Sequence, residues 1–263
     1  MSATFEKIKA FLLSEGIDTF SSIKSGCLSV IDEKRMPENV KSAVMFLMPY
    51  YTGKHENRNV SLYAVGLDYH LYIKELSAKF GGDDGYFYRF FADTSPINER
   101  DAALKAGLGF KGRNGLVINE KYGSYVFIGT ILTDAVFDDD EYAVTGEKKT
   151  CMGCGLCKKN CAFLRGECDF CLSELNQRKN VTDAELEIIL SKKIRWGCDT
   201  CQQVCPHNKD VKITPIEFFH KDLLEKVDAD MIENMSKDEF SKRAYAWRGK
   251  KTLLRNLIVD NER

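Results

Sequence analysis

Apolar residues recur along the first half of the chain with two different spacings. Spacings of three and four residues predict helices, which we expect over residues 4–13, 67–80 and 93–106. Short apolar or aromatic runs predict strands, which we expect at residues 40–48, 86–91, 116–118 and 124–132. The last two strands would be joined by a turn at 121–123. Because strands mix with helices through residue 135, we expect an α/β layered domain.

Glycine and proline mark the expected ends of these elements. Pro49 follows the first apolar strand, and Gly81 with Gly82 follows the second helix. Residues 93–96 resemble a helix start with proline at the first helical position, and Gly107 resembles its end. The composition changes after residue 137, where residues 138–150 are polar and predict a linker. A cysteine-rich segment follows, and the tail from about residue 210 has a helical composition. We therefore expect three parts, at 1–140, 141–210 and 211–263, the last a helical tail that packs on the core.

Composition and charge describe an ordinary globular protein. The 263 residues are 44% hydrophobic and 29% charged, with a formal net charge of −1, so no overall field attracts nucleic acid. One segment, 241–255, is an exception, because it carries six basic residues and no acidic one: Lys242, Arg243, Arg248, Lys250, Lys251 and Arg255. This pattern is typical of a solvated helix face and also of a nucleic-acid contact.

Cysteine usage indicates metal rather than disulfides. No apolar run is long enough to span a bilayer, and residues 1–15 lack the pattern of a secretion signal. We therefore expect a cytoplasmic protein without a membrane partner. Of the ten cysteines, nine lie between positions 151 and 205, and only Cys27 lies outside. Clustered cysteines in a reducing compartment favour metal binding.

The spacing of these cysteines is typical of a two-cluster ferredoxin. The first motif has gaps of two, two and three residues, and the second has gaps of two and three before a proline. In two-cluster ferredoxins the fourth cysteine of each run binds the other cluster. The sequence therefore predicts two [4Fe–4S] clusters with crossed ligands. The first would be bound by Cys151, Cys154, Cys157 and Cys205, and the second by Cys161, Cys171, Cys198 and Cys201.

Zinc is the alternative for part of this segment. Cys168, Cys171, Cys198 and Cys201 have the spacing of a zinc ribbon. That assignment would leave five cysteines of the segment without a role, including the whole first motif. One departure from ferredoxins is that Cys161 is followed by Ala162 and not by proline.

Several motifs around the cysteines resemble the epoxyqueuosine reductase family, in the family's order. They lie at residues 63–70, 91–100, 106–114, 123–129, 171–175, 197–206 and 248–256. The resemblance implies removal of the epoxide oxygen of epoxyqueuosine in tRNA. It implies cobalamin and two [4Fe–4S] clusters as cofactors, on a nitroreductase-like and reductive-dehalogenase-like cobalamin-binding fold. The chain resembles a short form of the family, ending before the C-terminal helical-repeat domain, and it has an extra cysteine, Cys168.

The resemblance also implies roles for individual residues. Asp93 matches the family's catalytic acid, for which burial should raise the pKa; from the residues alone, 93–96 is equally a helix cap. Residues near the motifs are expected to bind cobalamin, with packing or hydrogen bonding to cluster sulfurs as alternative roles: Tyr63, Asp68, His70, Ser173, Asp199 and Thr200. Cys27 and Cys168 are expected to have no role.

A tRNA substrate would give the basic tail a function, since Lys250, Lys251 and Arg255 are suited to phosphate contacts. The other expected partner is an external electron donor such as flavodoxin or ferredoxin, and we expect a monomer. Two other functions remain open from the residues. One is a plain two-cluster electron carrier, although residues 1–150 are more than such a carrier needs. The other is a related cobalamin-dependent reductase, such as a dehalogenase, that acts on a small molecule.

Overall fold

The computed structural model describes residues 2–142 and 150–258. The chain forms two compact units, each assembled from three separate stretches. Unit 1 comprises residues 1–51, 69–154 and 207–217, and unit 2 comprises residues 52–68, 155–206 and 218–263. The expected boundaries at 140 and 210 stay predictions, and residues 143–149 of the expected linker lie outside the described residues.

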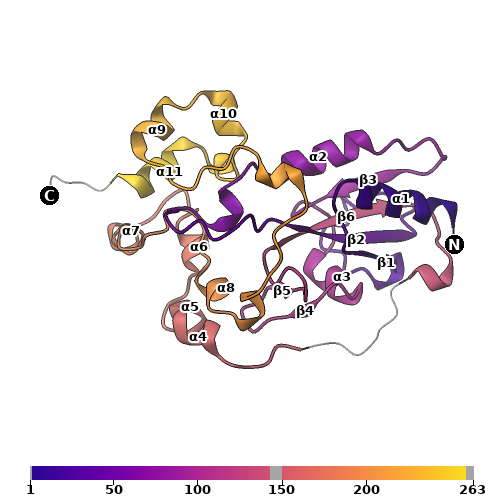
Figure 1. Ribbon diagram of the computed structural model, residues 1–263, viewed down its shortest axis with the longest axis horizontal. Helices are drawn as coiled ribbons and strands as arrows, with labels where there is room; N and C mark the ends of the chain where they lie inside the picture. Colours follow the sequence, from indigo (N-terminus) through magenta and orange to yellow (C-terminus); the bar gives the residue numbers. More distant parts are fainter. Residues whose placement is uncertain (1, 143–149, 259–263) are drawn as a thin grey trace. The chain divides into compact units, whose positions relative to one another are not determined.

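Unit 1 is built around a four-stranded antiparallel sheet with the strand order β1-β2-β6-β3 (Figure 1). Its strands are β1 Phe20–Lys24, β2 Ser42–Pro49, β3 Tyr88–Phe91 and β6 Val126–Thr133. Three helices belong to the same unit, namely α1 Ala3–Ser14, α2 Tyr69–Lys79 and α3 Glu99–Lys105. Short 3-10 turns lie at η1 Ser25–Cys27 and η3 Asp139–Glu141.

Helices cover both faces of this sheet, which explains why all eight residues of β2 are buried. Met45 and Leu47 lie on one face in a cluster with Ala102 and Ala103 of α3. On the other face, Phe90 of β3 contacts Phe11 of α1. Because successive side chains of a strand point to opposite faces, a strand covered on both sides has no polar face. The apolar run from Ala43 to Met48 was therefore a correct signal for a central strand.

One close approach within the sheet requires glycine. Gly129 of β6 is the register partner of Phe46 on β2, and a Cβ atom at Gly129 would lie 2.2 Å from the Phe46 ring. The ring occupies the space that a side chain would need. Gly129 thus allows a large aromatic residue to fill the centre of the sheet.

The expected helices and strands are confirmed in unit 1, with two corrections. The strands expected at 116–118 and 124–132 exist, but they do not pair with each other as consecutive strands would. Instead β5 Val117–Ile118 pairs with β4 Phe110–Lys111 in a separate two-stranded sheet, and β6 pairs with β2 and β3. The second correction concerns α3, which begins at Glu99 with Asn98 as its N-cap, three residues later than Pro96 predicted. The Asn98 side chain accepts a hydrogen bond from the Asp101 N–H, which satisfies one free donor of the first turn.

Unit 2 is made of short helices and loops. The cysteine-rich stretch contains α4 Leu156–Asn160, α5 Ala162–Arg165, α6 Leu172–Leu175, α7 Asp183–Leu190 and α8 Thr200–Gln203. The tail contains α9 Ala229–Asn234, α10 Lys237–Ser241 and α11 Lys250–Leu257. The 3-10 turns η2 Leu62–Ala64 and η6 Ala246–Arg248 lie within the unit, while η4 Pro206–Asn208 and η5 Glu217–His220 lie at its boundaries with unit 1.

An apolar core joins the three stretches of unit 2. Fully buried Trp196 packs with Val60 and Tyr245, which come from the first and last stretches. Two buried asparagines supplement this core. Asn176 exchanges hydrogen bonds with the backbone of Gly197, and Asn256 donates to the carbonyls of Asn176 and Arg195. Because these amides satisfy backbone groups inside the core, they fix the loop that leads into Cys198.

The fold is thus a mixed α/β fold, as expected, while its finer description as a cobalamin-binding fold stays a prediction. Among the helices that the structure describes, none combines the length and apolarity needed to cross a bilayer.

Candidate functional site: a thiol-lined cavity and an aspartate loop

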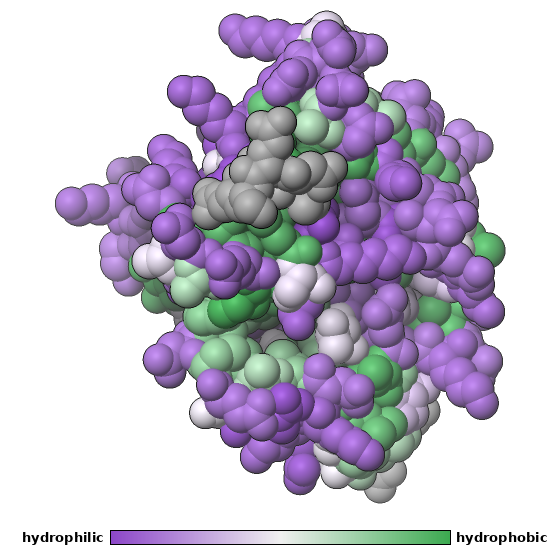
Figure 2. Space-filling model, turned by 90° about the vertical axis from the view of Figure 1, so that its left-hand side faces the viewer, coloured by the Kyte–Doolittle hydropathy of each residue, from purple (hydrophilic) through white to green (hydrophobic). Residues whose placement is uncertain are grey.

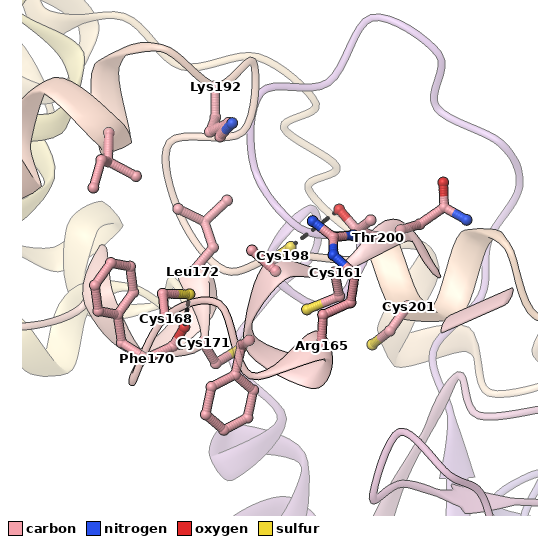
Figure 3. Close-up of a pocket in the computed structure, with 14 residues that line it drawn as sticks. Cys161, Arg165, Cys168, Phe170, Cys171, Leu172, Lys192, Cys198, Thr200 and Cys201 are labelled. Atoms are coloured by element: carbon pink, nitrogen blue, oxygen red, sulfur yellow. Dashed lines mark hydrogen bonds between the residues drawn. The ribbon is translucent and has the colours of Figure 1, made fainter. Parts of the chain in front are cut away.

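Five cysteines line a single cavity of about 410 Å³ in unit 2 (Figure 3). They are Cys161, Cys168, Cys171, Cys198 and Cys201. Four of them are the ligands predicted for the second cluster, and they come from three separate segments of the chain. All five thiols are free and partly exposed. The structure therefore brings this predicted quartet together, with Cys168 beside it.

Short helices present these thiols. Cys161 lies between α4 and α5, Cys171 precedes α6, and Cys201 lies in the first turn of α8. Cys198 lies just before α8, and its Sγ is 3.3 Å from the Thr200 Oγ1. Each short helix turns the chain back toward the cavity, which is how distant positions reach one site.

The thiols interact electrostatically as well. Burial, and then the neighbouring Cys198, Cys171 and Cys161, raise the pKa of Cys201 to about 12. Burial also raises the pKa of Cys171. Several thiolates at such close range repel one another, so a positively charged centre among them is needed to hold them deprotonated. The donor set is therefore suited to a thiophilic metal centre, iron or zinc.

Within residues 2–142 and 150–258, no group of three His, Cys, Asp or Glu side chains is arranged to hold one metal ion. A cubane cluster spreads its ligands, because each thiolate binds a different iron atom. Four thiols that share one cavity fit such a cluster by their number and chemistry.

A buried ion pair fixes the loop between Cys198 and Cys201. Asp199 and Arg58 are 1% and 4% exposed, and their Oδ2 and Nη1 atoms are 2.7 Å apart. Asp199 also accepts hydrogen bonds from Ser61 Oγ at 2.5 Å and from the Leu62 N–H at 2.9 Å. Burial raises the pKa of Asp199, while Arg58 and the two hydrogen bonds oppose this rise. Both carboxylate oxygens are thus engaged within the protein, and the loop is anchored to residues 58–62.

The quartet predicted for the first cluster is divided between the units. Cys151 and Cys154 belong to unit 1, whereas Cys157 and Cys205 belong to unit 2. Backbone hydrogen bonds from Gly153 and then from Arg113 lower the pKa of Cys151, which favours its thiolate. This ligand set stays a prediction.

A second candidate site surrounds Asp93 in unit 1. Asp93 lies in the loop between β3 and α3, has φ +56°, and is exposed. The Tyr69 hydroxyl donates a hydrogen bond to Asp93 Oδ2, and the Tyr69 ring stacks on Phe127 with the ring centroids 3.9 Å apart. The expectation that Asp93 is buried is thus wrong, and so is its alternative as a helix cap, because Asn98 caps α3.

The buried carboxyl group at this site is that of Glu99, not that of Asp93. Its side chain is 8% exposed, and its Oε2 accepts a hydrogen bond of 2.8 Å from the Asp93 N–H. Burial raises the pKa of Glu99 to about 7, and the nearby Asp93 contributes to the rise. Because the left-handed region is unfavourable for residues other than glycine, the contact with Glu99 helps to hold Asp93 in this conformation.

The remaining cofactor-binding candidates are distributed over both units. In unit 2, Tyr63 packs on the apolar core, and the Asp68 N–H donates to the Lys242 carbonyl. His70 follows Tyr69 in α2 of unit 1. Ser173 accepts hydrogen bonds from the Gln177 amide through its carbonyl and hydroxyl oxygens. Their cobalamin contacts stay predictions.

The three basic residues predicted to bind nucleic acid differ in their surroundings. Lys250 donates to the carbonyls of Glu233 and Met235. Arg255 donates to two carbonyls that follow α6. Only Lys251 is exposed. Two of the three side chains thus bind the protein's own backbone.

Sequence reasoning missed four residues of these sites, namely Tyr69, Glu99, Arg58 and Ser61. Tyr69 and Glu99 lie inside the motifs quoted for the family resemblance, so their positions were visible but their contacts were not. Arg58 and Ser61 are about 140 residues away from Asp199 along the chain, and no local pattern connects them.

Comparison with known proteins supports the fold and the family. The family model described as "Epoxyqueuosine reductase QueG, DUF1730" matches residues 31–94. The epoxyqueuosine reductase of Cyclobacterium marinum is 32% identical over 237 residues, covering 81% of this chain and 72% of that protein. The enzyme of Listeria monocytogenes is 29% identical over 281 aligned positions, covering 94% of this chain and 71% of that protein.

Solved structures agree on the fold. An epoxyqueuosine reductase from Streptococcus thermophilus matches with a TM-score of 0.74 at 22% identity, covering 98% of this chain and 80% of the other. A crystal structure of an epoxyqueuosine reductase with an epoxyqueuosine-modified tRNA-Tyr stem loop matches with a TM-score of 0.74 at 23% identity, covering 97% of this chain and 79% of the other.

A thiol-lined cavity and a carboxyl loop on a mixed α/β fold, together with these relatives, define the chain as an oxidoreductase. It belongs to the epoxyqueuosine reductase family.

Proposed function

We propose that this chain removes the epoxide oxygen from epoxyqueuosine in tRNA, with cobalamin and two [4Fe–4S] clusters as cofactors. The observation that carries the proposal is the gathering of Cys161, Cys171, Cys198 and Cys201 on one cavity, in a chain whose relatives are epoxyqueuosine reductases. The reaction requires single electrons, which a cluster bound by these thiols would supply, and protons, of which Asp93 would deliver one.

The reaction consumes two electrons and two protons. The carbon–oxygen bonds of the epoxide break, a carbon–carbon double bond forms, and the oxygen leaves as water. When bound, cobalamin supplies a low-potential cobalt centre for the chemistry at carbon, and the clusters supply single electrons. The protein's task is to hold these groups, orient the substrate and provide protons.

Asp93 is the proposed proton donor. Because its Oδ2 accepts the Tyr69 hydroxyl hydrogen bond, Oδ1 is the oxygen that can carry a transferable proton. The Glu99 carboxylate accepts a hydrogen bond from the Asp93 N–H and so holds the backbone of this loop. The exposed position of Asp93 gives a substrate direct access to the carboxyl group.

Individual residues are proposed to hold cobalamin on the strength of the family resemblance. They are Tyr63, Asp68, His70, Ser173 and Thr200. Asp199 shares the resemblance, but its two oxygens are occupied by Arg58, Ser61 and Leu62. We therefore propose that Asp199 acts by anchoring the loop between Cys198 and Cys201.

The tRNA and the electron donor are the proposed partners. Lys251 is suited to a phosphate contact because it is exposed in the basic tail. Lys250 and Arg255 would contribute mainly by holding α11 in place. Electrons would come from flavodoxin or ferredoxin, to a monomeric enzyme in the cytoplasm.

Anaerobic reconstitution of the whole chain tests this proposal. The protein is loaded with iron, sulfide and cobalamin, its metals are counted, and it is incubated with reductant and tRNA that contains epoxyqueuosine. We expect about eight iron atoms per chain, bound cobalamin, and nucleosides that have lost one oxygen by mass spectrometry. Asp93→Asn, loaded to the same iron content, is the matched inactive control.

Three results would contradict the proposal. Bound iron and cobalamin without loss of oxygen would favour a small-molecule substrate. The same iron without cobalamin would favour a plain electron carrier. Stoichiometric zinc in place of iron would remove the electron-transfer function altogether.

A further inference from the structure

The cavity that contains the five thiols opens among exposed apolar side chains. Phe163 of α5 and Ile188 of α7 line it and are 43% and 39% exposed. Leu156, at the start of the adjoining α4, is 37% exposed. Figure 2 shows apolar residues lying among hydrophilic ones on one side of the molecule. Two exposed apolar side chains thus line the cavity, and a third lies in the helix next to it, which is more apolar surface than a solvated face needs.

Three exposed lysines lie on or next to the cavity wall. Lys192 lines the cavity, and Lys158 and Lys159 lie in α4, whose last residue, Asn160, lines it. In the part of the chain that the structure describes, none of these three ammonium groups has an ion-pair partner. Arg165 also lines the cavity, but its charge is paired with Glu167. Three lysines without an ion-pair partner among the described residues therefore lie on the cavity wall or in the helix that leads into it.

We propose that this rim is a docking surface for a small acidic protein that carries single electrons. An apolar centre with a charged border is the usual anatomy of a protein interface. The partner would present carboxylates to Lys158, Lys159 and Lys192, and its own redox group would approach the partly exposed thiols. One electron leaves the carrier and one is taken up at the cysteine-bound centre, so the transfer balances without any proton or bond change.

RNA is the other polyanion that could neutralise these lysines, and the observations favour a protein. Of the three exposed apolar side chains, Leu156 and Ile188 are aliphatic, and Phe163 alone offers a ring on which a base can stack, which is little for a single-stranded RNA contact. The patch also surrounds the groups that must receive electrons. The inference rests on the proposed function only in that the cavity must hold a redox cluster.

The test compares two reductants on the reconstituted whole chain. Reduced flavodoxin serves as the acidic protein donor and dithionite as the small donor, and loss of the visible absorbance of the clusters is followed in a stopped-flow instrument. The variants are K158E/K159E, and K192E, in which the changed residue does not adjoin a cysteine. The matched control is K34E/K237E, which changes the net charge as much as the double variant, at exposed lysines that neither line the cavity nor belong to α4, α5 or α7.

We expect K158E/K159E to lower the second-order rate with flavodoxin about tenfold or more at low salt, because steering by charge raises association rates by about 10- to 1,000-fold. K192E should lower it less. The rates with dithionite and the iron content should stay within about twofold of the parent, and the control should match the parent. Higher salt should slow the parent reaction and reduce the difference between variants.

Equal flavodoxin rates for all variants would overturn the proposal. It would also be overturned if the rim variants lost tRNA affinity while flavodoxin reduced them normally, because the rim would then be an RNA contact. If the rim variants slowed reduction by flavodoxin but the parent protein did not convert epoxyqueuosine, the docking surface would be supported and the proposed substrate rejected. A chain that binds no iron would reject both.

Discussion

Each unit contains a buried carboxylate that positions exposed reactive groups, and the two carboxylates differ in one respect. In unit 1, Glu99 holds the Asp93 loop without a cation beside it. In unit 2, Asp199 anchors the loop between Cys198 and Cys201 with a buried arginine as its partner. Burial raises the pKa of both groups, but only Asp199 has a positive charge to oppose that rise.

The arginine partner decides how strongly each buried carboxyl group responds to pH. The Arg58 guanidinium, which keeps its proton in proteins, favours the charged form of Asp199 and so opposes the effect of burial on its pKa. A carboxyl group without such a partner titrates near neutrality, so the loop of the proton donor responds to pH.

The largest effect is expected from removing a cavity thiol. Cys171→Ser should lower the iron content by about half, from about eight to about four atoms per chain, and abolish turnover. Cys168→Ser is the matched control, since both thiols line the same cavity. It should leave iron and activity unchanged. Iron and sulfide analysis distinguishes the two, and equal losses in both variants would favour the zinc ribbon.

Replacing the proton donor should have the next largest effect. Asp93→Asn keeps the size of the side chain and its contact with Tyr69, but it cannot donate a carboxylic proton. Positioned acids contribute about 10²- to 10⁴-fold to rates, and we expect a loss of turnover in that range with normal iron content. Single-turnover assays on epoxyqueuosine tRNA measure it. Turnover within about threefold of the parent would remove Asp93 from the mechanism.

Breaking the ion pair in unit 2 should mainly lower stability. Asp199→Asn leaves Arg58 buried without a counter-charge, and such losses typically cost about 3–5 kcal/mol. We expect a drop of that size in the free energy of unfolding, accompanied by poorer iron retention. Arg58→Met combined with Asp199→Leu removes both charges and should recover part of the stability. If the single variant were as stable as the parent, the anchoring role would be wrong.

The smallest effect, and the one that depends most on pH, is expected at Glu99. Its pKa is about 7 in the folded chain, against 4.5 as its ordinary value. Between these values the folded chain holds a proton that the unfolded chain has lost, so stability falls as pH rises through this window. Glu99→Gln carries no charge and avoids this loss. It should therefore be more stable than the parent above pH 7, by about 3 kcal/mol at most, with the advantage disappearing at about pH 4.5.

Thermal unfolding measured across this pH range checks the prediction, and a stability difference that does not change with pH would contradict it. Glu99→Ala provides a second comparison. Unlike glutamine, alanine cannot accept the Asp93 hydrogen bond, so we expect it to lower turnover in addition.

The sequence predicted those features that depend on local pattern. Strand β2 was visible because an apolar run without a polar face must be buried on both sides, and the cysteine spacings identified a quartet that the structure gathers on one cavity. The start of α3 was misplaced, because Pro96 is a strong local signal while the actual cap, Asn98, is a common residue in many loops. The pairing of β5 and β6 was wrong because neighbours in sequence need not pair when a third strand competes.

The contacts that control the candidate sites form between residues that only the folded chain brings together, so the sequence pattern could not predict them. Burial of Glu99 follows from the helix and strand packed around it, and the partnership of Arg58 with Asp199 joins two stretches of unit 2. The basic tail illustrates the same limit. Lys250 and Arg255 look alike as charges in a sequence, yet both are used to bind backbone carbonyls.

The central claim is that the cysteines of this chain hold iron–sulfur clusters that pass single electrons. Electron paramagnetic resonance of the anaerobically purified chain, before and after reduction with dithionite, tests it most directly. The account predicts signals of reduced [4Fe–4S] clusters that integrate to about two per chain, and to about one in Cys171→Ser. A chain that gives no signal on reduction and carries stoichiometric zinc would contradict it.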